Sequence, residues 1–247
     1  MTTSLITGAT GGIGAAIAAD LAARGDRLLL CGRDPDRLRA ALAALPPGGA
    51  AGAGGGHPGR EGDPSPGHGV LVADLGRPGG LAAQVAGVLP ERLDVLVHCA
   101  GVVDLGGIGE TDVAAWERAL AVNLVGPAEL TRLALPALRA AGGHVVLINS
   151  GAGLSAGPRW GAYAASKFGL RALADALRAE EPGLRVTSVY PGRTATAMQE
   201  SVHAQEGRAY DPARWIRPGA VAAAVRTALD LPAGSHLTEV TVRPAAG

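Results

Sequence analysis

Short apolar runs alternate with alanine-rich helical stretches along nearly the whole chain, and this alternation limits the possible folds more than any other feature. The runs expected to form strands are 4–7, 27–31, 70–73, 93–98, 144–149, 185–190 and 237–243. The stretches expected to form helices lie near 12–24, 36–44, 79–89, 112–140, 160–179 and 218–229. Most strand runs are apolar at consecutive positions, as expected where helices cover both faces of a sheet. The pattern predicts an α/β fold built on a doubly wound parallel sheet.

A chain of 247 residues can form this fold as one domain, because α/β folds often reach roughly 250 residues undivided. We therefore expect a single domain over residues 1–247. Hydrophobic residues make up 47% of the chain but aromatic residues only 3%, so the core is expected to consist of Ala, Val and Leu. The segment 46–69 is too rich in Gly and Pro to bury a core, and we interpret it as a surface loop inserted into the domain.

The charge balance gives no reason to expect a polyanionic partner. The chain has 22 basic and 22 acidic residues, which argues against nucleic acid or an anionic membrane surface as the target. A small molecule is the expected ligand. No run of about 18 apolar residues is free of Gly, Pro and charge, no signal peptide is evident, and Cys31 and Cys99 do not resemble a disulfide framework. We therefore expect a cytoplasmic protein without a membrane span.

A glycine-rich turn follows the first predicted strand. The sequence TGATGGIG at 7–14 leads into an alanine-rich helix. Glycines allow a sharp turn and let backbone N–H groups approach a pyrophosphate at the helix N-terminus. A turn needed only for packing is the alternative, but the position at the first strand–helix junction favours dinucleotide binding. The candidate cofactor contacts in this turn are Gly8, Thr10, Gly12, Ile13 and Gly14.

Tyr163 and Lys167 form the centre of a candidate catalytic site. They are four residues apart on a predicted helix, so they project from one face as neighbours. A phenol has a reference pKa of about 10, and a nearby ammonium favours the phenolate and lowers that pKa. Ser150 stands at the end of the preceding strand, where its hydroxyl can hold a substrate carbonyl or alkoxide. A Tyr/Lys pair alone also arises by surface packing, but together with the serine and the glycine turn it indicates catalysis.

The spacing T-G-x-x-x-G-x-G, with Ser150, Tyr163 and Lys167, resembles the short-chain dehydrogenase/reductase family over nearly the whole chain. The resemblance implies a Rossmann-type seven-stranded sheet of order 3-2-1-4-5-6-7 and reversible hydride transfer between a nicotinamide cofactor and a carbonyl or secondary alcohol. Tyr163 would act as acid/base, Ser150 would stabilise charge on the substrate oxygen, and Lys167 would bind the nicotinamide ribose. Family members usually associate through the helices expected at 112–140 and 160–179, which implies a homodimer or homotetramer.

The resemblance also favours NADP(H) over NAD(H). Gly32 stands where NAD-preferring members carry an acid, and Arg33 follows it, as in NADP-preferring members. The alternative is that Arg33 is a solvated side chain and Asp34 caps the next helix. The chain departs from many NADP-preferring members at Gly11, where they carry a second basic residue.

Two further strand ends match family positions that contact the cofactor. Asp74 and Leu75 correspond to the pair that contacts adenine, although Asp74 could equally cap the following helix. Ala100 and Gly101 keep the end of the family sequence Asn-Asn-Ala-Gly, in which Cys99 replaces the second Asn. We expect no metal site at His98 and Cys99, because no further His or Cys clusters with them.

The remaining family positions lie in the second half of the chain. Asn123 corresponds to an Asn that binds a water relaying protons from the lysine, and a hydrogen bond at a helix interface is compatible with that role. The sequence PGRTAT at 191–196 resembles the segment that contacts the nicotinamide carboxamide. Its candidate contacts are Pro191, Gly192, Thr194 and Thr196.

Two other functions are open to such a chain. A dinucleotide sensor without turnover usually lacks the Tyr/Lys pair that this chain keeps. A 3-ketoacyl-carrier-protein reductase tends to carry basic residues before the fifth strand, but the stretch 139–144 is poor in charge. The segment 199–217 is expected to be a mobile lid that sets substrate specificity.

The expected strand order also excludes a disulfide between Cys31 and Cys99. The first strand would separate them, and two inter-strand steps of about 4.8 Å would place them near 10 Å apart. That separation exceeds the limit of roughly 7 Å between Cα atoms for a disulfide.

Overall fold

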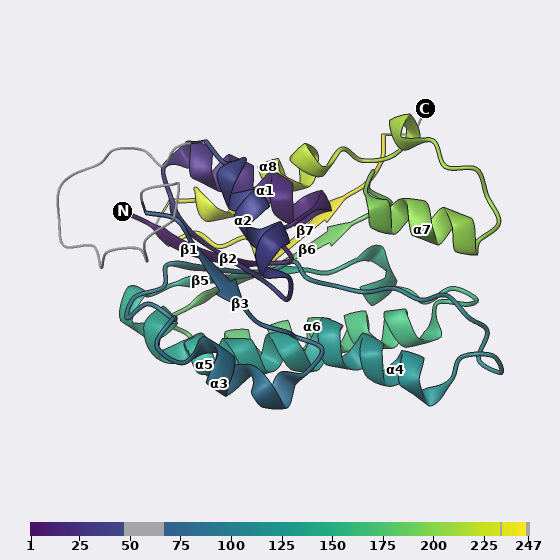
Figure 1. Cartoon of the computed structure of the whole chain (residues 1–247), viewed down its shortest axis with the longest axis horizontal. Coiled ribbons are helices and arrows are strands. Elements are labelled where there is room, and N and C mark those ends of the chain that lie inside the picture. The colour runs from purple at the N-terminus through teal and green to yellow at the C-terminus, as the bar shows by residue number, and fades with distance from the viewer. Residues whose placement is uncertain (47–66, 233, 246–247) are drawn as a thin grey trace.

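A parallel seven-stranded sheet forms the centre of the computed structural model, which describes residues 1–46, 67–232 and 234–245. Its strand order is β3-β2-β1-β4-β5-β6-β7, which confirms the expected fold class and topology (Figure 1). The strands are β1 (Thr3–Thr7), β2 (Arg27–Gly32), β3 (Gly69–Val72), β4 (Val95–His98), β5 (His144–Ile148), β6 (Arg185–Pro191) and β7 (Glu239–Val242). Because β1 lies between β2 and β4, it separates Cys31 from Cys99, and both cysteines are free.

Helices cover both faces of this sheet (Figure 1). On one face lie α1 (Gly12–Arg24), α2 (Pro35–Ala43) and α8 (Pro218–Leu229). On the other lie α3 (Leu81–Val85), α4 (Val113–Leu120), α5 (Gly126–Ala141) and α6 (Gly161–Glu180). A further helix, α7 (Ala197–Gln205), projects beyond the sheet. None of the helices in the described ranges is long and apolar enough to cross a membrane.

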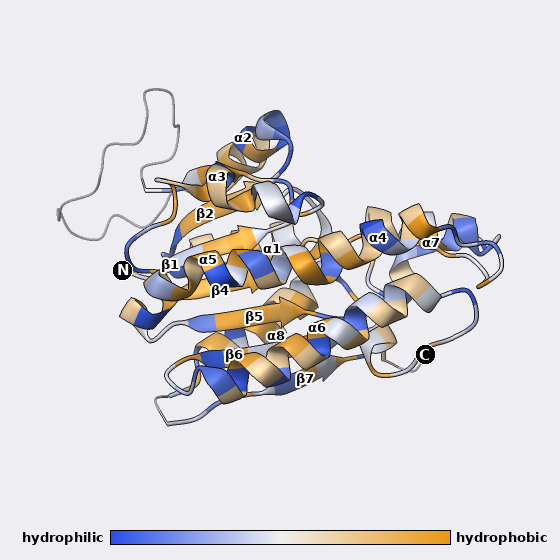
Figure 2. Ribbon diagram, turned by 90° about the horizontal axis from the view of Figure 1, so that it is seen from below, coloured by the Kyte–Doolittle hydropathy of each residue, from blue (hydrophilic) through white to orange (hydrophobic). Residues whose placement is uncertain are grey.

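The core is divided by the sheet into two hydrophobic clusters. Neighbouring strand residues point to opposite faces, so Leu5 belongs to the cluster under α5 and α6 while Ile6 belongs to the cluster under α1 and α8. Val145 and Val146 divide in the same way on β5. The central strands of the sheet are largely apolar (Figure 2), as a sheet covered on both faces requires.

Local capping explains several helix boundaries. Asp34 accepts hydrogen bonds from the backbone N–H groups of Asp36 and Arg37 and so caps α2, and Pro35 occupies its first turn. Gly25 ends α1 with φ 96°, a conformation that glycine adopts without strain. Asp34 therefore caps the helix that follows it, as the alternative interpretation of this segment expected.

Three helical stretches differ from the sequence-based expectation. The stretch 112–140 is not one regular helix, because α4 and α5 are joined by a π-helical turn at Ala121–Val125. The stretch 79–89 is helical only at Pro78–Gly80, a 3-10 turn, and at α3. The segment 199–217, expected to be a mobile lid and not included among the expected helices, contains most of α7 and a 3-10 turn at Pro212–Arg214.

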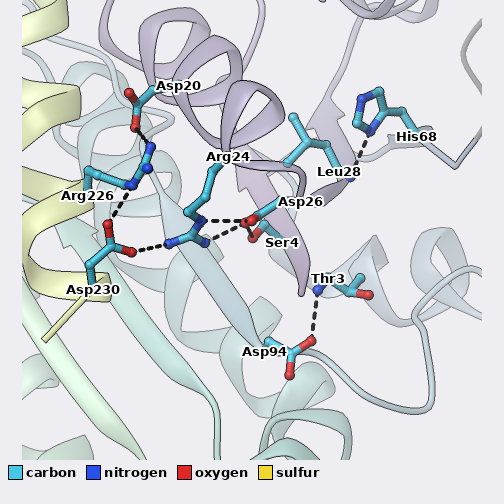
Figure 3. Close-up of polar contacts among 10 residues, drawn as sticks. All are labelled: Thr3, Ser4, Asp20, Arg24, Asp26, Leu28, His68, Asp94, Arg226 and Asp230. Carbon is cyan, nitrogen blue, oxygen red and sulfur yellow. Dashed lines mark hydrogen bonds and ion pairs between the residues drawn. The ribbon is translucent and has the colours of Figure 1, made fainter. Parts of the chain in front are cut away.

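The expected insertion at 46–69 lies mostly outside the described residues. Its last residues are not a surface loop, because His68 is buried and its Nδ1 accepts a hydrogen bond of 3.1 Å from the Leu28 N–H (Figure 3). Gly69 already belongs to β3.

A polar network ties α1, β1 and α8 together at the amino ends of the strands (Figure 3). The carboxylate of Asp26 is buried and accepts a hydrogen bond of 2.6 Å from the Ser4 hydroxyl. Arg24 donates to both oxygens of Asp26 and reaches Asp230 at 3.0 Å, and Arg226 binds the other oxygen of Asp230. This network links the helices to the sheet at the amino ends of its strands, opposite their carboxyl ends.

Two buried histidines predict that the protein loses stability in mild acid. Burial lowers the pKa of both His98 and His144 to about 3, with smaller contributions from nearby Lys167 and Arg185 respectively. In the unfolded chain each takes up a proton near pH 6.5, so stability is complete above that pH and falls as the pH drops toward 3. Each histidine should therefore cost about 2 kcal/mol of unfolding free energy at pH 5.

The variant His144→Gln tests this expectation, because glutamine can reach the Thr187 hydroxyl that His144 contacts at 2.7 Å but does not titrate. Urea unfolding at pH 8 and pH 5 should show that the variant loses about 2 kcal/mol less than the wild type. Equal losses of unfolding free energy in the wild type and the variant would contradict a lowered pKa of His144 in the folded protein.

Candidate active site

The carboxyl ends of the parallel strands meet at one edge of the sheet and surround a pocket of about 390 Å³. The sequence-predicted residues that line it are Ile13, Ser150, Tyr163, Pro191, Gly192, Thr194 and Thr196. The other predicted residues lie behind this pocket or at neighbouring strand ends. The structure therefore brings the candidate catalytic residues Ser150 and Tyr163 together with the segment expected to contact nicotinamide.

The turn between β1 and α1 has no room for a side chain at Gly8 or Gly14. Gly8 and Gly12 have φ values of 68° and 56°, which favour glycine. A Cβ on Gly14 would lie 2.2 Å from the Gly8 carbonyl oxygen, and a Cβ on Gly8 would lie 2.7 Å from the Ala100 backbone. This turn leaves bare backbone at the N-terminus of α1, the arrangement that a dinucleotide pyrophosphate requires. Thr10 belongs to the same turn.

The Thr7 side chain joins this turn to the end of β4. Its hydroxyl oxygen accepts hydrogen bonds from the N–H groups of Cys99 and Ala100, at 3.0 and 3.1 Å. Cys99 therefore contacts Thr7 through its backbone N–H, and this contact does not depend on its side chain. Gly101 follows, and a Cβ on it would lie 3.3 Å from Asn123 Oδ1 and 3.9 Å from Lys167 Nζ.

The ends of β2 and β3 carry the residues expected around the adenosine half of a cofactor. Arg33 is exposed and forms no ion pair with any residue in the described ranges. Asp74 does not cap the following helix; its Oδ1 accepts a hydrogen bond of 3.0 Å from the Gly76 N–H. Leu75 is buried, and its Cβ and carbonyl oxygen lie against Gly126.

Ser150 and Tyr163 are positioned by β5 and α6. Ser150 follows β5 and its hydroxyl oxygen accepts a hydrogen bond of 3.1 Å from the Ala152 N–H. Tyr163 is 8% exposed, with its ring edge against Trp160 at a centroid distance of 5.7 Å. Burial raises the pKa of Tyr163, and a hydrogen bond with Ser150 opposes this shift. The phenol is therefore protonated at neutral pH, the form that can donate a proton.

Lys167, the only lysine of the chain, is buried behind the tyrosine ring. Its Nζ donates a hydrogen bond of 3.0 Å to the Ile148 carbonyl and lies 5.8 Å from the centroid of the Tyr163 ring. Burial lowers the pKa of Lys167 to about 8. The sequence predicted that Lys167 lowers the pKa of Tyr163. In the structure the pKa of Tyr163 is raised, because the effect of burying the phenol is larger than that of an ammonium 5.8 Å from the ring centroid.

Asn123 lies in the π-helical turn and is fully buried. Its Oδ1 accepts from the Val102 N–H at 2.9 Å, and its Nδ2 donates to the Val102 carbonyl and to the Ser166 hydroxyl at 2.9 and 3.0 Å. Both amide hydrogens are thus used within the protein. The Ser166 hydroxyl in turn donates to the Tyr163 carbonyl at 2.7 Å. Asn123 therefore holds α6, the helix of Tyr163 and Lys167, through a helix-interface hydrogen bond with Ser166, as the sequence allowed.

The segment after β6 forms one side of the pocket. Thr194 is buried, and its hydroxyl donates to the Gly192 carbonyl at 3.0 Å. Thr196 caps α7, accepting from the Gln199 N–H at 3.2 Å, and its methyl group faces the glycine turn, 3.1 Å from where a Cβ on Gly12 would stand. Thr196 therefore lies between the expected cofactor cradle and the helix over the pocket.

Sequence reasoning missed several pocket residues. Trp160, Arg193, Met198 and Arg243 line the pocket. Gln199 and Val202 of α7 also line it and lie in the segment 199–217 that was expected to set specificity. The Leu105 N–H donates to the Gln205 side chain at 2.8 Å, which joins the end of α7 to the segment after β4. The position of Arg243 depends on the pairing of β7 with β6.

Comparison with known proteins agrees with this geometry. A family model described as short chain dehydrogenase matches residues 2–51 and 71–207. An uncharacterised short-chain type dehydrogenase/reductase of Sinorhizobium fredii is 33% identical, with 98% of this chain and 90% of that protein covered. The glycine betaine reductase of Emericella nidulans is 34% identical over 98% of this chain, but the chain spans only 18% of its length.

Solved structures give the same result. A metagenomic short-chain oxidoreductase in complex with NADP is 32% identical, with a TM-score of 0.76 and coverage of 100% of this chain and 98% of that one. Further structures at 26–30% identity hold NADP or 5-hydroxy-NADP. The match of the family model over most of the chain, on a sheet of this order, shows that the protein is an oxidoreductase of the short-chain dehydrogenase/reductase family.

Proposed function

We propose that this protein catalyses reversible hydride transfer between NADP(H) and a carbonyl or secondary alcohol substrate. One observation carries the proposal: Ser150 and Tyr163 face the same pocket as Thr194 and Thr196, and the only lysine lies buried behind them. A phenol and a hydroxyl that share a pocket can hold one substrate oxygen between them.

The glycine turn fits a dinucleotide, because a Cβ would fill the space at Gly8 and Gly14 that a pyrophosphate needs. Gly12, Ile13, Thr10 and the backbone after β4 would complete its contacts. When bound, the nicotinamide supplies or accepts the hydride.

In carbonyl reduction, the buried Tyr163 phenol donates its proton to the substrate oxygen, and the raised pKa keeps that proton available. The Ser150 hydroxyl donates a hydrogen bond to the same oxygen as negative charge develops on it. In the reverse direction the phenolate must form, and the Lys167 ammonium, 5.8 Å from the ring, favours it. General acid catalysis of this kind contributes about 10² to 10⁴ in rate.

Asn123 acts as a positioning residue in this proposal. Its amide holds α6 and the segment after β4, so the proton relay that the family resemblance implies would use its free oxygen lone pair or its backbone carbonyl rather than its amide hydrogens.

Two observations support NADP(H) over NAD(H). Arg33 is exposed at the end of β2 with no carboxylate partner in the described ranges, so its guanidinium is available to a 2′-phosphate. Related proteins of known structure that share about a third of the sequence carry NADP.

Replacing Arg33 by Ala should raise the KM for NADPH by roughly 10-fold or more, because a charge-assisted hydrogen bond contributes about 1.5–3 kcal/mol. The KM for NADH should change less than about twofold. Arg39→Ala is the matched control, since Arg39 pairs only with Asp36 on the exposed face of α2. Equal effects of Arg33→Ala on both cofactors would remove the basis for the NADP preference.

The carrier-protein reductase gains no support from the structure. The cation before β5, Arg139, is bound by both oxygens of Glu181 at 2.9 and 2.5 Å, and His144 is buried. A screen of carbonyl compounds with NADPH, read as loss of nicotinamide absorbance, tests the proposed activity. A sensor would bind NADPH and reduce none of them.

We also expect a homodimer or homotetramer formed through α4, α5 and α6. Large apolar side chains are exposed on α4 and α6, at Val113 (71%) and Phe168 (41%), and on the π-helical turn between α4 and α5, at Val125 (46%). Sedimentation at micromolar concentration should show a multiple of the 24.5 kDa chain mass. A single 24.5 kDa species would contradict this expectation.

A further inference from the structure

Arg243 lies beside the catalytic serine although it comes from the far end of the chain. It directly follows β7 and lines the pocket. Its guanidinium rests on Gly151, the residue after Ser150: a Cβ on Gly151 would lie 3.0 and 3.3 Å from the two terminal nitrogens. One of these nitrogens donates to the Tyr190 carbonyl at 3.5 Å. The strand ends of β5, β6 and β7 thus hold the guanidinium near the reacting oxygen.

The positive charge of Arg243 has no carboxylate partner among the described residues. The pocket lining contains no Asp or Glu. The preceding acid on its strand, Glu239, is four residues away, about 13 Å at 3.3 Å per residue, and it binds Arg171 and the Tyr190 hydroxyl.

The other cation of the pocket differs in this respect. Arg193 donates to both carboxylate oxygens of Glu206 at 2.8 and 2.6 Å and lies over the Trp215 ring at 5.6 Å. Its charge is neutralised within the protein. The pocket therefore contains one uncompensated positive charge, that of Arg243, among walls that are otherwise neutral.

We propose that Arg243 binds a carboxylate of the substrate whose carbonyl oxygen is held by Ser150 and Tyr163. The inference rests on the proposed hydride transfer and specifies its substrate class: a small oxo acid, or the corresponding hydroxy acid. A guanidinium offers a planar pair of N–H donors that matches a carboxylate. A single free cation suits one negative charge, whereas a phosphate dianion would leave charge uncompensated in this pocket.

The spacing limits the size of such a substrate. Adjacent Cα atoms are about 3.8 Å apart, and the guanidinium contacts the residue next to Ser150. The carboxylate and the carbonyl should therefore be separated by only a few bonds. Acetoacetate and levulinate, with one and two methylene groups between these functions, are suitable probes. Their primary amides have the same shape without the charge.

The test compares each acid with its amide in wild type, Arg243→Met and the control Arg39→Met, which removes a positive charge outside the pocket. In the wild type, kcat/KM with NADPH should favour at least one acid over its amide by roughly 10-fold or more. Arg243→Met should abolish most of this preference by raising the KM of the acid, with the amide changed less than about twofold. Arg39→Met should keep the preference.

Calorimetric titration of acetoacetate and levulinate into the NADPH-loaded proteins gives a second readout that does not need turnover. Binding of the acid should weaken by roughly 10-fold or more in Arg243→Met and persist in Arg39→Met. If wild type binds these acids through Arg243 but reduces no carbonyl compound, the hydride-transfer proposal fails and the carboxylate site stands as a binding site. If acid and amide are bound and reduced alike in the wild type, or if Arg243→Met weakens NADPH and both probes equally, the carboxylate assignment is overturned.

Discussion

Replacing Tyr163 by Phe should lower kcat by about 10²-fold or more while the affinity for NADPH stays within about twofold. The substitution removes one hydroxyl and keeps the ring that packs against Trp160 at 5.7 Å. Without this hydroxyl no proton donor of suitable strength remains at the substrate oxygen, because the Ser150 hydroxyl is far less acidic. Cofactor affinity is measured by fluorescence titration and the rate on the best carbonyl compound of the screen.

Tyr190→Phe is the matched control for this experiment. It also removes a tyrosine hydroxyl, but one that binds Glu239 at 3.0 Å outside the pocket. It should lower the free energy of unfolding by about 1 kcal/mol and leave kcat unchanged. If Tyr163→Phe keeps more than about a tenth of the wild-type rate, Tyr163 is not the general acid.

The second large effect concerns Lys167. Because it is the only lysine of the chain, its side-chain NMR signal can be assigned directly. Protein labelled with ¹³C at the lysine ε-carbon should give one side-chain resonance. In the cofactor-free protein that resonance should titrate with a pKa of about 8, because burial disfavours the ammonium. A midpoint near the usual value of about 10.4 would show that the ammonium is solvated and not held at Ile148.

Lys167→Met keeps most of the side-chain volume and removes the charge. It should lower kcat by about 10²-fold, since the phenolate loses its nearby cation. It should also weaken NADPH binding by roughly 10-fold, the value of one charge-assisted hydrogen bond. The pH profile of alcohol oxidation should shift to higher pH, because the pKa of Tyr163 rises further. A loss of rate without any shift of the profile would indicate a purely structural role.

The two catalytic variants distinguish an enzyme from a sensor. In an enzyme, Tyr163→Phe separates turnover from cofactor binding, whereas Lys167→Met affects both. A sensor would show no turnover in the wild type, so neither variant could lower a rate.

The sequence pattern by itself determined the doubly wound sheet and most element positions, and the family resemblance implied the strand order. Continuous apolar runs separated by alanine-rich helices have few solutions other than a doubly wound sheet, and α1 and α8 begin and end where the pattern predicts. It also placed Ser150, Tyr163 and the segment 191–196, because parallel strands bring their carboxyl ends to a common edge.

The helix boundaries that the sequence predicted wrongly are those set by contacts between residues far apart in the chain. The π-helical turn around Asn123 depends on hydrogen bonds to Val102 and Ser166, which no local pattern encodes. The helix α7 has little amphipathic signal of its own, and it is held by contacts such as that between Leu105 and Gln205, 100 residues apart in the chain.

Only the tertiary structure decided the electrostatics of the site. Spacing on a helix placed Lys167 beside Tyr163, but the depth of burial, which raises the pKa of the phenol and lowers that of the ammonium, follows from the packing of α6 against α4 and β6. Likewise, Arg193 and Arg243 look alike in the sequence, because each is an arginine shortly after the end of a strand. The fold pairs Arg193 with Glu206 and brings Arg243 to Gly151 without a carboxylate partner in the described ranges. Whether a charge is neutralised depends on which side chains the chain brings within a few ångströms, and that is a property of the folded molecule rather than of its sequence pattern.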